Sequence, residues 1–233
     1  MIKWEHSVFA LPFAYLGLFL AENGWPRFPL LFWITVAMVS FRTLAMGLNR
    51  LLDQTIDAAN PRTAGRALPS GKLKRPFVWM ACSASLILFE ASTYMLRPLC
   101  FVLSPVPVAL AVLYPLTKRF TWLSHFVLGM ILAVAPYGAW LASRGEWSWI
   151  PALISTGVVF WVAGFDIIYA LQDIDFDRCY GLHSIPSRFS PPVALTFAQL
   201  FHLISVACWF AAGWLCGLRM IYDAGLLAVA LFL

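Results

Sequence analysis

Oxygen-bearing side chains recur at helical spacing in two polar segments of this otherwise apolar sequence. The first segment, MGLNRLLDQTIDAANPRTAGRALPSGKL, contains Asn49, Asp53 and Asp57 at intervals of four residues. Residues four apart lie one above the other on a helix, with their Cβ atoms about 5–6 Å apart. Two ionised carboxylates at that distance repel each other unless a cation binds between them. The spacing therefore indicates a cation site.

The second segment, GFDIIYALQDIDFDRCYGLHSIPSRFS, repeats this arrangement. It contains Asp166, Tyr169, Asp173 and Asp177 at positions i, i+3, i+7 and i+11, which places them along one face of a helix. Asp166 lies about a turn inside an apolar run, where a carboxylate costs roughly 2.5–3.5 kcal/mol on insertion scales. Acids at such positions usually face a wet, functional cavity. Asp166 thus argues against the simpler interpretation, in which each acidic segment is a solvated helix end.

Oxygen-only ligands suit Mg²⁺, an ion that commonly bridges carboxylates to the phosphates of a substrate. Two carboxylate pairs that faced each other would hold two such ions with a diphosphate between them. Arginine and lysine side chains would bind the remaining phosphate oxygens. The candidates for this role are Arg62, Arg66, Lys118 and Arg119.

The elements that must position these residues are membrane helices. Of the 233 residues, 61% are hydrophobic and 12% are charged, whereas soluble domains typically carry about 25% charged residues. The apolar runs are spread evenly, with no low-complexity or linker segment between them. The sequence therefore predicts one integral membrane domain over residues 1–233, an all-α polytopic transmembrane helical bundle.

A helix that spans a bilayer needs about 20 apolar residues. We expect about seven full membrane helices plus an incomplete C-terminal one, because the last apolar run begins at Asp223 and reaches Leu233, the last residue. The seven full spans cover roughly residues 7–22, 29–48, 76–96, 98–115, 121–142, 150–171 and 192–217.

The distribution of cations predicts the orientation, because lysine and arginine are enriched in cytoplasmic loops. With the N-terminus inside, eleven of the 16 Lys and Arg residues fall inside, Lys3 among them. Four fall outside, including Arg219, and Arg42 lies within the second helix. Four crossings separate the second predicted helix from the sixth, so both acidic segments open on the cytoplasmic side.

The sequence also bears on functional classes other than an enzyme that acts on a diphosphate. The net charge of +5 does not indicate nucleic acid, because the cations form no helix-long basic face with stacking aromatics. An ion-coupled membrane transporter would also carry paired intramembrane acids, but here the acids gather at one surface. A non-catalytic membrane scaffold stays open as a third class.

The segments NRLLDQTIDAANPRTAGRALPSGKL and DIIYALQDIDFDRCYGLHSIP resemble the two signature regions of the UbiA superfamily of intramembrane aromatic prenyltransferases. The segment YPLTKRFTWLSHFVLG is also similar to this family, so the resemblance runs through most of the chain. The patterns NxxxDxxxD, YxxxD and DxxxD occur in the expected order. The resemblance implies Mg²⁺-dependent transfer of a polyprenyl group from a polyprenyl diphosphate to a ring acceptor within the lipid bilayer.

The resemblance also assigns roles to individual residues. Asn49, with the first two acids, would serve one Mg²⁺, and the basic side chains would bind substrate. The metal ligands that the resemblance implies are Asp53, Asp57, Asp173 and Asp177, with Asp166 and Tyr169 lining the pocket beside them. From residue type and position, the predicted catalytic residues are Asp166, Asp173 and Tyr169, and the predicted substrate-binding residues are Arg42, Asn49, Arg62, Arg66, Lys118 and Arg119.

In this mechanism negative charge grows on the leaving diphosphate as the allylic C–O bond breaks, and the metal and basic residues stabilise it. Tyr169 would stabilise the allylic cation through cation–π attraction, and Asp166 or Asp173 would remove the ring proton. Arg42 lies seven residues before Asn49 on the same helical face. It would bind an acceptor carboxylate, the alternative being a structural pair with an acid.

Within the superfamily, the first segment is most similar to the 4-hydroxybenzoate polyprenyltransferases and their relatives in menaquinone synthesis. A 4-hydroxybenzoate-like acceptor in respiratory quinone biosynthesis is therefore expected, with a dihydroxynaphthoate acceptor as the alternative. The resemblance places the protein in a bacterial plasma membrane with its site facing the cytoplasm. The family fold normally has nine helices, so the chain is expected to lack a C-terminal part.

Overall fold

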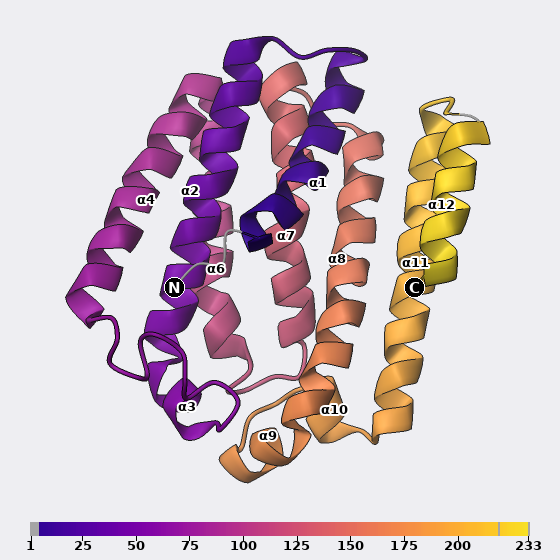
Figure 1. Cartoon of the computed structure of the whole chain (residues 1–233). Helices are drawn as coiled ribbons and strands as arrows, with labels where there is room; N and C mark the ends of the chain where they lie inside the picture. The colour runs from indigo at the N-terminus through magenta and orange to yellow at the C-terminus, as the bar shows by residue number, and fades with distance from the viewer. Residues whose placement is uncertain (1–4, 219, 233) are drawn as a thin grey trace. The chain divides into compact units, whose positions relative to one another are not determined.

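The computed structural model describes residues 5–218 and 220–232, and every regular element among them is a helix (Figure 1). The all-α prediction is therefore confirmed. Lys3 and Arg219 of the predicted charge pattern lie outside the described residues. In chain order the elements are α1 (Glu5–Glu22), α2 (Phe28–Leu52), α3 (Gln54–Ala59), α4 (Arg75–Leu96), α5 (Pro98–Leu103), α6 (Pro105–Thr117), α7 (Ser124–Arg144), α8 (Trp149–Ala170), the 3₁₀ turn η1 (Leu171–Asp173), α9 (Ile174–Tyr180), α10 (Ile185–Arg188), α11 (Pro191–Leu215) and α12 (Met220–Phe232).

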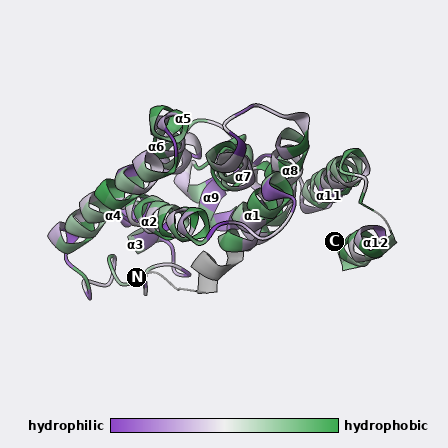
Figure 2. Cartoon of the chain, turned by 90° about the horizontal axis from the view of Figure 1, so that it is seen from above, coloured by the Kyte–Doolittle hydropathy of each residue, from purple (hydrophilic) through white to green (hydrophobic). Residues whose placement is uncertain are grey.

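Six helical segments of the described chain are long and apolar enough to cross a membrane, so the chain is an integral membrane protein. Two shorter apolar stretches, Ala10–Glu22 and Met220–Phe232, correspond to the first and last predicted helices. Figure 2 shows the long helices mostly in the green of hydrophobic residues. The six segments are Phe28–Leu52, Arg75–Leu96, Pro98–Thr117, Ser124–Arg144, Trp149–Tyr180 and Pro191–Leu215.

The chain divides into two compact units. The N-terminal unit comprises residues 1–116 and 138–145, and the C-terminal unit comprises residues 117–137 and 146–233. Helix α7 therefore contributes its first part to the C-terminal unit and its last part to the N-terminal unit. Each unit contains one of the two acidic segments, and the prediction that residues 1–233 form one domain stays a prediction.

Helices α2 and α4 pack along each other in the N-terminal unit, where a glycine permits their close approach. A Cβ atom at Gly47 of α2 would lie only 2.4 Å from Sγ of Cys82 on α4. The hydroxyl groups of Tyr15 and Thr35, 2.9 Å apart, join α1 to α2. Small residues and interhelical hydrogen bonds of this kind are typical of membrane helix packing.

The predicted span over residues 98–115 is interrupted at Ser104, where α5 gives way to α6. Pro105 follows, and proline has no N–H to continue a helical ladder. The Ser104 hydroxyl donates instead to Oε2 of Glu90 on α4, at 2.6 Å. The break thus supplies a hydrogen-bond donor to an acid that lies inside an apolar helix.

Helices α8 and α11 pack closely along each other in the C-terminal unit. A Cβ atom at Gly157 would lie 2.3 Å from Nε1 of Trp209, so only glycine lets the indole ring approach. The indole N–H donates to the Ile154 carbonyl oxygen at 3.2 Å, and the Ser205 hydroxyl donates to the Gly157 carbonyl oxygen at 2.8 Å. The C-terminal end of α8, which carries the second acidic segment, therefore extends from a firmly packed helix.

Candidate active site

The first acidic segment forms a corner between α2 and α3. Asp53 follows the end of α2 with φ −97° and ψ 8°, near the sparsely populated bridge region, and the chain turns there into α3. The helical ladder nevertheless continues, because the Asp53 N–H donates to the Asn49 carbonyl oxygen at 3.0 Å and the Asp57 N–H donates to the Asp53 carbonyl oxygen at 2.7 Å. Asp53 is 2% exposed and Asp57 is 5% exposed. The one-turn spacing that the sequence predicts is therefore retained, with both acids buried.

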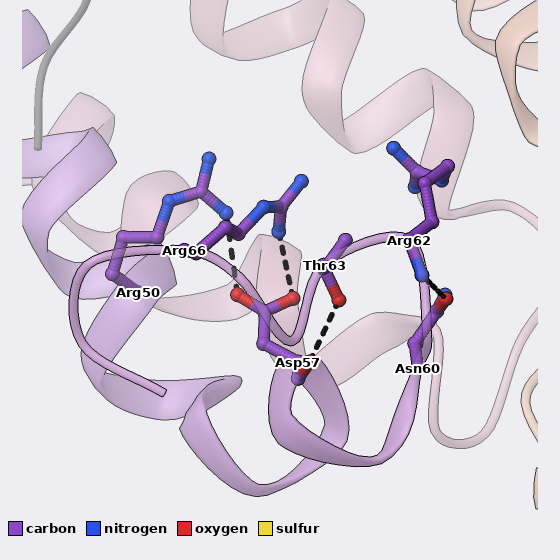
Figure 3. A network of polar contacts seen from close by, with 6 residues as sticks. All are labelled: Arg50, Asp57, Asn60, Arg62, Thr63 and Arg66. Carbon is purple, nitrogen blue, oxygen red and sulfur yellow. Dashed lines mark hydrogen bonds and ion pairs between the residues drawn. The ribbon is translucent and has the colours of Figure 1, made fainter. Parts of the chain in front are cut away.

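Two arginine side chains hold the Asp57 carboxylate (Figure 3). Nη1 of Arg66 donates to Oδ1 at 2.7 Å, and Nη1 of Arg50 donates to Oδ2 at 3.3 Å. Arg50 comes from the last turn of α2, whereas Arg66 comes from the loop that follows α3. Asp57 thus ties this loop to the end of the membrane helix.

The arginine pair changes the interpretation of three residues. Asp57, a predicted metal ligand, and Arg66, a predicted phosphate-binding residue, contact each other directly. Arg50 was assigned no site role from the sequence, although it lies seven residues before Asp57 and hence on the same helical face. That spacing was the available signal for its contact with Asp57.

The loop after α3 folds back through short-range hydrogen bonds. The Thr63 hydroxyl donates to the Asp57 carbonyl oxygen at 2.9 Å. Oδ1 of Asn60 accepts the Arg62 N–H at 2.9 Å (Figure 3), a side-chain turn that Asn often forms. The Arg62 side chain is exposed, so this predicted phosphate-binding residue lies on the open surface of the loop.

Arg42 lies within the membrane-spanning part of α2, two turns before Asn49, and both residues are half-buried. The Nε atom of Arg42 is buried and has no hydrogen-bond partner among the described residues. A buried guanidinium N–H without an acceptor is costly. The position therefore favours an anionic or carbonyl ligand that the protein itself does not supply.

The second acidic segment repeats the corner of the first. Helix α8 ends at Ala170, one 3₁₀ turn follows, and α9 begins at Ile174. Asp173 takes φ −112° and ψ 9° and precedes α9, as Asp53 precedes α3. Two acids with matching positions in the predicted motifs thus have matching backbone conformations.

A buried histidine contacts the deepest acid of the second segment. Nδ1 of His125, on the first turn of α7, lies 2.7 Å from Oδ2 of Asp166 on α8. Nε2 of the same ring accepts the Ile185 N–H at 3.2 Å. The sequence favours a structural or interfacial role for His125 over a phosphate contact, and no spacing rule links it to Asp166, 41 positions away.

The remaining predicted residues of the C-terminal unit lie around this histidine contact or on the surface. Oδ2 of Asp177 accepts the Ser184 hydroxyl at 3.0 Å. The carbonyl oxygen of half-buried Lys118 accepts the His183 N–H at 2.7 Å. Arg119 is exposed, and Tyr169 is 48% exposed. The structure therefore groups Asp166, Asp177 and the Lys118 backbone through the segment that follows α9.

Within the described part of either unit, no group of three or more His, Cys, Asp or Glu side chains is gathered closely enough to hold a metal ion. The metal ligands predicted from the sequence accordingly stay predictions. What each unit does offer is a set of carboxylate oxygens at a helix corner with cations or hydrogen-bond donors beside it.

The sequence profile of the UbiA prenyltransferase family matches residues 10–233. The chain belongs to this family. The structure is also similar to the apo structure of a UbiA homolog from Aeropyrum pernix K1, with a TM-score of 0.91 and 34% sequence identity, covering 99% of this chain and 86% of that one. The resemblance inferred from the two acidic segments is thereby confirmed.

Other UbiA relatives agree with this assignment. The chain is 28% identical over 217 residues to a 4-hydroxybenzoate octaprenyltransferase of Francisella tularensis subsp. novicida (strain U112), covering 93% of this chain and 76% of the relative. A UbiA homolog from Archaeoglobus fulgidus bound to DMAPP and Mg²⁺ has the same fold, with a TM-score of 0.72, 19% identity and coverage of 96% of this chain and 82% of that one.

From its contacts with Arg50 and Arg66, we expect Asp57 to stabilise the loop that follows α3. Replacing Asp57 with Asn removes the charge that both arginines bind, and each hydrogen bond to a charged group contributes about 1.5–3 kcal/mol. Amide hydrogen exchange in residues 60–73, followed by mass spectrometry, should accelerate by at least about tenfold. Asp175→Asn, which changes an exposed acid, serves as the control. Unchanged exchange in the Asp57 variant would show that the arginines do not hold the loop.

Proposed function

We propose that the chain transfers a polyprenyl group from a polyprenyl diphosphate to a small aromatic carboxylate of the 4-hydroxybenzoate type, with Mg²⁺ as cofactor. The observation that carries this proposal is the pair of matching corners at Asp53 and Asp173, each part of an oxygen-only donor set. Family membership and the names of the curated relatives support the reaction and the acceptor class. The UbiA homolog bound to DMAPP and Mg²⁺ supports the donor class and the metal.

The donors of both corners fit Mg²⁺ in chemical type. Asn49, Asp53, Asp173 and Asp177 supply amide and carboxylate oxygens, and a hard divalent cation prefers such ligands. Asp57 also fits in chemical type. Each of its oxygens accepts one hydrogen bond from an arginine and keeps a second lone pair for a cation. When bound, Mg²⁺ supplies positive charge that stabilises the leaving diphosphate.

The chain's own cations would act on the same leaving group. The planar guanidinium groups of Arg62 and Arg66 suit bidentate contact with phosphate oxygens, and Lys118 and Arg119 add charge from the C-terminal unit. As the allylic C–O bond breaks, its electron pair passes to the diphosphate oxygen. Donors fixed in advance around that oxygen lower the barrier because they need no reorganisation.

Residues at the C-terminal end of α8 are our candidates for stabilising the allylic cation and removing the ring proton. The exposed ring of Tyr169 can stabilise the allylic cation by cation–π attraction without reacting with it. The acceptor ring then forms the new C–C bond with the allylic carbon. Its ring proton passes to a carboxylate, for which Asp166 is our candidate and Asp173 the alternative.

Arg42 is our candidate for binding the acceptor carboxylate. Its buried Nε lacks a hydrogen-bond partner among the described residues, and a carboxylate is the anion that matches a guanidinium fork. We also propose that residues 1–233 act as one domain whose site faces the cytoplasm of a bacterial inner membrane. The excess of cations on the predicted inner side supports this orientation.

The direct test is an assay of membranes that contain the chain, with radiolabelled polyprenyl diphosphate, Mg²⁺ and a panel of acceptors. A labelled lipid product that forms with 4-hydroxybenzoate and disappears on addition of EDTA is expected. Product with only a dihydroxynaphthoate would move the acceptor to the menaquinone type. Ion flux without product, or no activity of either kind, would contradict prenyl transfer.

The two corner acids should each be needed for turnover. Asp53→Asn and Asp173→Asn are each expected to lower kcat by about 10²–10³, the scale of losing one electrostatic stabiliser of a transition state. Asp175→Asn is the matched control, because Asp175 is an exposed acid two residues from Asp173. Near-normal turnover in either corner variant would remove that residue from the metal site.

Arg42 should affect the acceptor and not the prenyl donor. Loss of a hydrogen bond to a charged group costs about 1.5–3 kcal/mol, so Arg42→Ala should raise the acceptor KM by about 10–100-fold. Arg42→Lys should fall between the variant and the wild type, because lysine keeps the charge without the planar fork. An unchanged acceptor KM in Arg42→Ala would refute the assignment.

A further inference from the structure

His125 makes two hydrogen bonds that fix both its protonation state and its orientation. Its side chain is 3% exposed, and it contacts Asp166 through Nδ1 and the Ile185 backbone through Nε2. A backbone N–H can only donate, so Nε2 must carry a lone pair. The proton of the neutral ring therefore lies on Nδ1 and is donated to Oδ2 of Asp166.

We propose that His125 is a positioning residue for Asp166, holding this carboxylate in one orientation for its part in the reaction. Oδ2 of Asp166 accepts the imidazole N–H, and Oδ1 accepts no hydrogen bond from the described residues. Oδ1, with both lone pairs open, is thus our candidate for the oxygen that receives a proton. This step rests on the proposed function, because it takes Asp166 as the base for the ring proton.

The same geometry excludes a proton relay through His125. A relay would pass the proton from Asp166 to Nδ1 while Nε2 released another. Here Nδ1 already bears a proton, and Nε2 faces a buried N–H and not solvent. His125 consequently acts through the position and charge of Asp166.

His125 also connects Asp166 to the second corner. Ile185, which donates to Nε2, follows Ser184, whose hydroxyl donates to Asp177 at 3.0 Å. Ser184 and Ser187 bind each other's backbone N–H groups at the start of α10, a capping box that fixes this turn. One rigid turn therefore carries a donor to Asp177 and a second donor to the histidine that holds Asp166.

Two amide substitutions separate the two bonds of His125. The side-chain nitrogen of Asn reaches the position of Nδ1 and keeps a donor for Asp166. The side-chain oxygen of Gln reaches the position of Nε2 and keeps an acceptor for Ile185. His125→Gln should lower kcat by about 10–100-fold, the usual effect of losing a group that orients an active-site ligand. His125→Asn should stay closer to the wild type, and the KM for prenyl diphosphate should be unchanged in both.

A double variant that combines His125→Gln with Asp166→Asn tests whether His125 acts through Asp166. Residues that act through one another show non-additive effects, so adding His125→Gln to Asp166→Asn should cost little further kcat. Additive losses, or a His125→Asn variant weaker than His125→Gln, would overturn the proposal and leave His125 as an anchor of α10. His183→Gln, at an exposed histidine of the same segment, should keep kcat within about twofold of the wild type.

A spectroscopic measurement tests the same bond without turnover. In the full chain labelled with ¹⁵N-histidine and purified in micelles, the signal lost in His125→Asn should belong to a neutral ring protonated at Nδ1, and it should shift in Asp166→Asn. A ring protonated at Nε2, or at both nitrogens, would overturn the proposal. If the wild type makes no prenylated product, the proposed function fails, while this spectrum still decides whether His125 holds Asp166 through Nδ1.

Discussion

The site depends on one physical constraint, the cost of keeping carboxylates ionised at the end of a membrane helix without bulk water around them. Removing a partner from a buried ion pair is strongly destabilising, because it leaves a charge uncompensated. In this protein the buried or half-buried acids with defined contacts have protein donors. Asp57 has two arginines, Asp166 has a histidine and Asp177 has a serine hydroxyl. Arg50 lies on α2 itself, but each of the other donors lies on a segment that must fold back or pack alongside, so the acids shape the neighbouring loops.

The helix corners follow from the same requirement. A straight continuation of α2 or α8 would carry the last acids away from the donors in the following loop. The chain instead turns at Asp53 and at Asp173, with ψ near zero at both residues, and each turn starts a short helix. Asp57 and Asp177, on these short helices, then meet donors from the loops that follow, Arg66 and Ser184. The repeated corner is the structural form of the repeated sequence motif.

Much of the fold was predictable because a bilayer forces the backbone to satisfy its own hydrogen bonds, so long apolar runs become helices. The acids of the site were equally predictable, since their spacing of four residues is retained across the corner at Asp53. The residues that donate hydrogen bonds to these acids could not be predicted from the sequence. Arg66 reaches Asp57 through a turn built by Asn60 and Thr63, and His125 reaches Asp166 only through packing of α7 on α8. The hydrogen bond from Ser104 to Glu90 of a neighbouring helix likewise follows no spacing rule.

Asp57 and Asp166 differ in the kind of side chain that donates hydrogen bonds to them. Asp57 is bound by flexible cations whose side chains are 22% and 32% exposed, and a polyphosphate would compete with the carboxylate for those same guanidinium groups. Asp166 is bound by a neutral ring that is 3% exposed and fixed by a backbone N–H, for which a polyphosphate offers no better partner. Under the proposed function, a bound diphosphate would draw the two arginines away from Asp57. The contacts of Asp166 would stay as they are, so the proposed base would keep its geometry.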